Sequence, residues 1–183
     1  VGSEMCIRDR LLEVRPNDGH LGLAELEADF NVTVVTQNID NLHERAGSRR
    51  IIHLHGELTK VCSSRDPYNL HYIKELKPDE YEVKFGDKAG DGTQLRPFIV
   101  WFGEPVPEIE TAVNYVEKAD IFVIIGTSMN VYPAAGLLNY VPREAEVYLI
   151  DPKPVDVHSM RRIHVIQKGA SEGVRELRSL LQP

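Results

Sequence analysis

A run of five apolar residues, IFVII at 121–125, constrains the fold of this chain more than any other feature. Strands without a polar face are typical of parallel sheets that are covered on both sides. Further short strands are predicted at 147–150 and 164–166, and a last helix at 171–181. Strands that alternate with helices predict an α/β fold with a doubly wound parallel sheet of the Rossmann-like kind.

The rest of the chain continues this alternation, with one exception. Residues 57–95 are polar and charged, and predict a lid or a small inserted subdomain. Its own apolar residues are expected to hold it together: Tyr68, Leu70, Tyr72, Ile73, Leu76, Tyr81 and Phe85. Elsewhere, strands are predicted at 32–35, 51–54 and 98–102, and helices at 17–30, 41–46, 107–116 and 133–140.

Polar or small residues directly follow four of the predicted strands. They are TQNID (36–40), HLHGE (53–57), FGE (102–104) and GTS (126–128). Ligands of doubly wound sheets bind outside the carboxyl ends of the strands, so these four segments are expected to converge on one crevice. Dense polar side chains beside apolar runs favour a site that grips a polar ligand.

These segments also carry a family resemblance. TQNID, LHERAGS (42–48) and HLHGEL (53–58) resemble the core signature of the sirtuins, the NAD-dependent protein lysine deacylases. Three later segments match in the same order: PFIVWFGE (97–104), GTSMNVYPAAGL (126–137) and KGASEGVRELRSLL (168–181). The resemblance runs from roughly Pro16 to the C-terminus, and several motifs in one order are far more specific than a lone glycine pattern.

The resemblance implies that NAD is bound. It assigns the nicotinamide-ribose pocket to Gln37, Asn38 and Asp40, and further NAD contacts to Gly126, Thr127, Ser128, Asp151, Gly169 and Ala170. Asp151 stands where the family often has an Asn that contacts the adenosine ribose. Two plainer interpretations stay open: an Asx-turn at 38–40 that holds its own backbone, and a helix-capping turn at 168–170.

The resemblance further implies a catalytic histidine, His55, and an acyl-lysine peptide as substrate. The peptide would add to the sheet as a strand along Val100, Phe102, Gly103 and Glu104, with Val131 on the other side of the cleft. In the implied reaction the acyl oxygen attacks the nicotinamide ribose, nicotinamide leaves, and His55 is the general base for a ribose hydroxyl. His53 shares a face with His55 if the strand is regular.

The two cysteines, Cys6 and Cys62, are too few for the four-thiolate zinc site that sirtuins usually carry. Cys62 stands about where the first cysteine pair would begin, and the remaining ligands are absent. We therefore expect no structural zinc and no other metal. The expected organisation is a non-family or artefactual N-terminus at 1–15 and a sirtuin-type domain at 16–183, with residues 57–95 as the inserted subdomain.

The family also begins with a strand and a glycine-rich loop that cradles the NAD phosphates. Neither matches here, so the chain is expected to be N-terminally truncated, with an incomplete NAD site. The residues that separate deacetylase from desuccinylase activity in some members would also lie upstream, so the acyl preference stays open.

Composition limits the partners. The net charge of −7 argues against a nucleic-acid binder, and no apolar run is long enough to span a membrane, so the cytoplasm is the expected location. The predicted function is an NAD-dependent protein-lysine deacylase, either a deacetylase or desuccinylase-like. The alternatives are a mono-ADP-ribosyltransferase that uses the same pocket and a catalytically inactive module that binds NAD or ADP-ribose.

Overall fold

The computed structural model describes residues 11–77, 82–126, 134–154 and 162–182. The chain divides into two compact units. The smaller unit contains Thr36–Asn41 and His55–Pro105, along with the chain up to Arg15; the larger contains Pro16–Val35, Leu42–Leu54 and Val106–Pro183.

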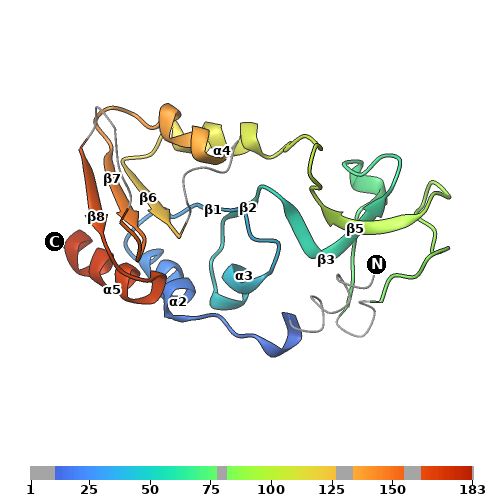
Figure 1. The fold of residues 1–183 in the computed structure, drawn as a ribbon, viewed down its shortest axis with the longest axis horizontal. Helices are drawn as coiled ribbons and strands as arrows, with labels where there is room; N and C mark the ends of the chain where they lie inside the picture. The colour runs from blue at the N-terminus through green and yellow to red at the C-terminus, as the bar shows by residue number, and fades with distance from the viewer. Residues whose placement is uncertain (1–10, 78–81, 127–133, 155–161, 183) are drawn as a thin grey trace. The chain divides into compact units, whose positions relative to one another are not determined.

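The larger unit is built on a parallel sheet of three strands (Figure 1). These are β6 (Ile121–Ile125), β7 (Glu146–Ile150) and β8 (Ile163–Ile166), in the order β6-β7-β8. All five residues of β6 pair in register with β7, and both neighbouring pairs run parallel. The predicted strands at 121–125, 147–150 and 164–166 are thus confirmed to within one residue at each end.

Helices cover both faces of this sheet, as a doubly wound fold requires (Figure 1). Side chains alternate along β7: Val147 and Leu149 join the core on one face, and Tyr148 and Ile150 join the core on the other. The first face is covered by α4 (Ile109–Val116) and the 3₁₀ helix η3 (Ala134–Tyr140); the second by α2 (Asp18–Leu26) and α5 (Ala170–Leu181). The parallel α/β prediction is therefore confirmed.

The first helix, α2, starts as predicted but ends early. The side chain of Asn17 caps it by accepting hydrogen bonds from the backbone N–H groups of Gly19 and His20. The helix stops at Leu26 rather than at residue 30. Two acidic residues, Glu27 and Asp29, follow, and the negative C-terminal end of a helix disfavours such charges.

Shorter elements complete the larger unit. The strands β1 (Val34–Thr36) and β2 (Ile51–His53) pair with each other, and α3 (Leu42–Ala46) lies between them in the chain. The predicted helix at 41–46 is confirmed to within one residue. The predicted helix at 133–140 is a 3₁₀ helix instead over its described residues, 134–140.

The smaller unit contains an antiparallel sheet where the sequence predicted a lid without a long strand. The eight-residue strand β3 (Gly56–Ser63) lies between β4 (Lys74–Glu75) and β5 (Leu95–Ile99). β3 was not predicted as a strand because threonine, lysine and serine interrupt its apolar residues in the sequence. Pairing on both sides satisfies its backbone, which is why a largely polar segment can be buried here.

The apolar residues that hold the smaller unit also differ from the prediction. Leu76 is buried as expected, but Leu70 and Phe85 are 83% and 94% exposed. The buried apolar side chains come chiefly from β3 itself, namely Leu58, Val61 and Cys62. Six of the eight residues of β3 are buried, on both faces of the strand, so β3 supplies a core that the flanking loops do not.

A buried hydroxyl, that of Ser63, organises the loops at one end of β3. It donates to the Asp91 carboxylate at 2.7 Å and accepts from the backbone N–H groups of Arg65 and Asp66 at 3.1 Å. Hydrogen bonds from Thr93 and Ser63 lower the pKa of Asp91 to about 2. We call Ser63, Asp91 and Thr93 the Ser63 network.

Candidate functional site

His55 lies in the turn between β2 and β3, and its ring is fixed by the backbone of the TQNID segment. The Nδ1 atom of His55 is 3.0 Å from the carbonyl oxygen of Gln37. A carbonyl only accepts hydrogen bonds, so Nδ1 must carry the proton. In the neutral ring this leaves Nε2 with a free electron pair, which is the form that a general base requires.

The backbone of His55 is fixed as firmly as its ring. Its carbonyl oxygen accepts a hydrogen bond from the backbone N–H of Val100 at 2.9 Å. Gly56, the next residue, pairs with Ile99 of β5 and has a φ of +78°. The predicted catalytic residue and the start of the predicted substrate segment are therefore joined by direct backbone contacts.

The TQNID segment lies beside His55 in the smaller unit. The hydroxyl of Thr36 accepts from the backbone N–H of Asn38 at 3.1 Å, and the carbonyl of Ile39 accepts from Leu58 of β3 at 2.8 Å. These bonds hold the segment that carries Gln37, Asn38 and Asp40. The structure thus brings three predicted pocket residues together with His55 in one unit.

The predicted substrate segment follows β5 and differs from the expected strand at 98–102. β5 ends at Ile99, and the chain then turns, with Gly103 at a φ of +90°. The side chain of Phe102 is fully exposed, and that of Trp101 is 42% exposed. The FIVWF run predicted burial because it is apolar, but its second half lies on the surface of this unit.

Glu104 closes this turn through its carboxylate. Arg96 donates two hydrogen bonds to it, at 2.7 and 2.9 Å, and the backbone N–H of Trp101 donates a third at 3.0 Å. The Arg96 guanidinium holds the pKa of Glu104 below its usual range. Arg96 was not among the predicted site residues; the available signal was an opposite charge eight residues before Glu104.

The remaining predicted NAD-binding residues that the structure describes lie in the larger unit, after the carboxyl ends of its parallel strands. Gly126 follows β6 and donates its N–H to the carbonyl of Ile150, at 3.0 Å. Asp151 follows β7, and its carboxylate accepts from the N–H of Lys153 at 2.8 Å. Gly169 is the N-cap of α5, and Ala170 is the first residue of that helix. Thr127, Ser128 and Val131 lie outside the described residues.

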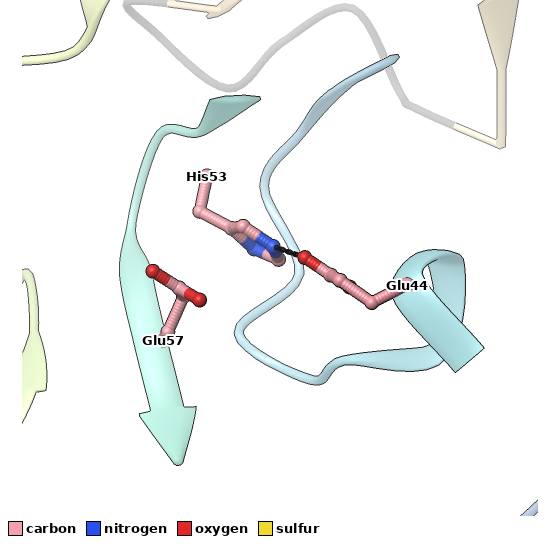
Figure 2. A group of neighbouring side chains, drawn as sticks. All are labelled: Glu44, His53 and Glu57. Atoms are coloured by element: carbon pink, nitrogen blue, oxygen red, sulfur yellow. Dashed lines mark hydrogen bonds and ion pairs between the residues drawn. The ribbon is translucent and has the colours of Figure 1, made fainter. Parts of the chain in front are cut away.

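His53 does not share the environment of His55. Strand β2 ends at His53, and a turn follows, so the regular alternation that would place both rings on one face is interrupted. Figure 2 shows the His53 ring directed at Glu44 of α3, with 2.7 Å between Nε2 and the carboxylate. Burial is the largest single influence and disfavours the charge on Glu44, but the hydrogen bonds from His53 and from the Glu44 backbone, together with the electrostatic influence of His53 and His43, keep the pKa of Glu44 below its usual range.

Cys62 is the one cysteine among the described residues, and its side chain is completely buried. The thiol is 3.7 Å from the carbonyl oxygen of Pro97, and burial raises its pKa. A thiol that is buried and hard to ionise is a poor metal ligand, because metals bind the thiolate.

Comparisons with known proteins agree with one another. The family model described as "Sir2 family" matches residues 3–133. An NAD-dependent protein deacylase of Bacteroides thetaiotaomicron is 82% identical over 176 residues, which are 96% of this chain and 75% of that protein.

Two solved structures have the same fold. A Sir2 homologue in complex with NAD is 34% identical, with a TM-score of 0.74, over 94% of this chain and 68% of that one. A complex of Sir2 with a p53 peptide and NAD+ is 27% identical, with a TM-score of 0.73, over 93% of this chain and 72% of that one. With the family model matched over more than half its length, the chain belongs to the Sir2 family.

Proposed function

We propose that this chain is an NAD-dependent protein-lysine deacylase that transfers an acyl group to ADP-ribose and releases nicotinamide. The observation that supports this most directly is the 3.0 Å contact between Nδ1 of His55 and the carbonyl of Gln37. It gives a protein of this family a histidine whose Nε2 can accept a proton. The deacylase names of close relatives agree with the proposal.

In the proposed mechanism, His55 takes a proton at Nε2 while the Gln37 carbonyl keeps the ring in one orientation. A base held in one tautomer needs no rearrangement when the proton moves. The imidazolium that results still donates from Nδ1 to the same carbonyl, so its positive charge is stabilised where it forms. The Gln37 carbonyl thus accepts a hydrogen bond from His55 in both protonation states of the ring.

NAD suits the residues that are present. The polar side chains of Gln37, Asn38 and Asp40 are assigned to the nicotinamide ribose, and Gly126, Asp151, Gly169 and Ala170 to the remainder. Gly126 adopts a φ of +59° directly after β6, and among the described residues nothing lies within 4 Å of a Cβ added there, which leaves room for a ligand beside it. When bound, NAD supplies the electrophilic ribose carbon. Thr127 and Ser128 are included in the proposed NAD site because they match the GTS motif of the family.

The proposed substrate is an acyl-lysine protein or peptide, with nucleic acids and membranes excluded as partners. The segment Val100, Phe102, Gly103 and Glu104, in which Phe102 and Gly103 are exposed, would receive the peptide backbone, together with Val131. No helix among the described residues is long and apolar enough to cross a membrane. We place the protein in the cytoplasm.

Mass spectrometry of acetyl- and succinyl-lysine peptides, incubated with this chain and NAD, tests the function. We expect the peptide to lose its acyl group and O-acyl-ADP-ribose to appear, and neither to occur without NAD. ADP-ribose attached to the peptide would favour a transferase instead. Bound NAD without any product would favour a binding module.

We further propose that the smaller unit needs no structural zinc. The Ser63 network supports this, because hydrogen bonds from a completely buried hydroxyl already join the loops at 65–66 and 91–93. Cys62, the one described thiol, is packed in the core of the unit.

Chelation and an Asp91→Asn substitution test this. EDTA is expected to leave the melting temperature unchanged, whereas domains held by zinc unfold when the zinc is removed.

Asp91→Asn is expected to lower the melting temperature at pH 7. Because the folded pKa of Asp91 is depressed to about 2 from 3.8, its contribution is complete above pH 3.8 and is lost as the pH falls toward 2. The variant should therefore show a flatter profile of melting temperature over this window. A fall in melting temperature with EDTA would contradict the zinc-free proposal.

A further inference from the structure

A bidentate ion pair closes the turn that carries the predicted substrate residues. Nη1 and Nη2 of Arg96 each contact one oxygen of the Glu104 carboxylate, and Nη2 also donates to the carbonyl of Ile99 at 3.2 Å. Both side chains are largely shielded from solvent, at 20% and 28% exposed. Paired hydrogen bonds between partly buried charges are the strong kind and fix direction as well as distance.

Both oxygens of the Glu104 carboxylate accept hydrogen bonds from groups of the same chain. One oxygen accepts from Arg96, and the other accepts from both Arg96 and the N–H of Trp101. The N–H of Glu104 in turn donates to the carbonyl of Trp101 at 3.0 Å. This side chain therefore has its hydrogen bonds already made before any peptide arrives.

The turn held in this way presents two aromatic side chains to solvent. Phe102 is fully exposed, and Trp101 is 42% exposed. One residue before them, Val100 is bonded to the backbone of His55. Any shift of the turn would thus move the aromatic surface relative to the catalytic residue, within a single unit.

We propose that Arg96 is a positioning residue. Its bidentate ion pair with Glu104 holds residues 100–104 in the conformation that receives an acyl-lysine peptide beside His55. The proposal rests on the deacylase function above and deepens it. In this proposal the Glu104 side chain fixes the conformation of the turn. The peptide is then contacted by the backbone of the turn and by Phe102.

Arg96→Lys tests this, because lysine keeps the positive charge and loses the planar fork. Trp101 is the single tryptophan of the sequence and lies within the turn, so its fluorescence reports on the turn directly. Acrylamide should quench Trp101 more strongly in the variant. The Kd of a tryptophan-free acetyl-lysine peptide should rise about tenfold, the size expected for losing a hydrogen bond to a charged group.

The KM values separate positioning from general damage. In the variant, the KM for the peptide should rise while the KM for NAD stays within about twofold, well inside the tenfold peptide effect. Arg65→Lys is the matched control, since it makes the same substitution on an exposed side chain of the same unit and should change neither. Equal changes in both KM values, or unchanged quenching and peptide affinity, would overturn the proposal.

Failure of the proposed function would look different. If the wild-type chain neither binds nor deacylates the peptide, the deacylase function fails and the positioning role falls with it. If the wild-type chain is active and Arg96→Lys matches it in every readout, only the positioning role is wrong.

Discussion

Replacing His55 by alanine is expected to reduce deacylation about a hundredfold to ten-thousandfold, the range that a positioned general base contributes. The structure gives the reason: Nδ1 is committed to the Gln37 carbonyl, so the ring has one nitrogen left to accept a proton. Alanine removes that acceptor and leaves the backbone contact between His55 and Val100 intact. Turnover should therefore fall while the fold is kept, as measured by deacylation rates together with thermal melting.

His71→Ala is the matched control for this experiment. His71 is an exposed histidine of the same unit, in the middle of the short 3₁₀ helix Leu70–Tyr72, and its removal should leave turnover unchanged. NAD affinity, measured by calorimetry, should stay similar to wild type in both variants. A His55→Ala protein that is folded and still turns over at the wild-type rate would remove the general-base assignment.

The parallel sheet could be predicted because its signal is local. The run at 121–125 carries no polar side chain, and only a strand covered on both faces accommodates that, so β6 was found residue for residue. His55 was predicted as the catalytic residue for a different reason, the HG dipeptide within a family motif. Neither inference required information about contacts between distant segments of the chain.

What the sequence did not show depends on contacts between distant residues. The tautomer of His55 is set by a carbonyl 18 residues earlier. The turn after Ile99 is closed by Arg96, which reaches across it to Glu104, whereas the apolar pattern alone favoured a strand through Phe102. β3 was missed because its burial depends on two partner strands that pair with it from opposite sides.

Gly56→Ala is expected to be the most destabilising single-methyl change near the site, at about 2–5 kcal/mol. Two costs combine. A non-glycine residue at the φ of +78° found here costs roughly 1–2 kcal/mol, and overpacking costs roughly 1–3 kcal/mol more. The overpacking is severe because the new Cβ would lie 2.2 Å from the carbonyl oxygen of Phe98, a backbone atom that cannot rotate away. Urea denaturation measures the loss.

Gly92→Ala separates the two costs. Gly92 has the same φ of +78° and lies in the same unit, but none of the described residues stands within 4 Å of a Cβ built there. It should lose only the conformational part, about 1–2 kcal/mol. The excess loss in Gly56→Ala then measures how closely β5 approaches the residue after His55. Because relief of that clash must push Phe98 and Ile99 away from β3, next to the Val100 that hydrogen-bonds His55, Gly56→Ala should also lower deacylation of the protein that remains folded, whereas Gly92→Ala should not. Equal losses of stability in the two variants would show that β5 yields to the extra methyl group, and that this contact does not fix the position of His55.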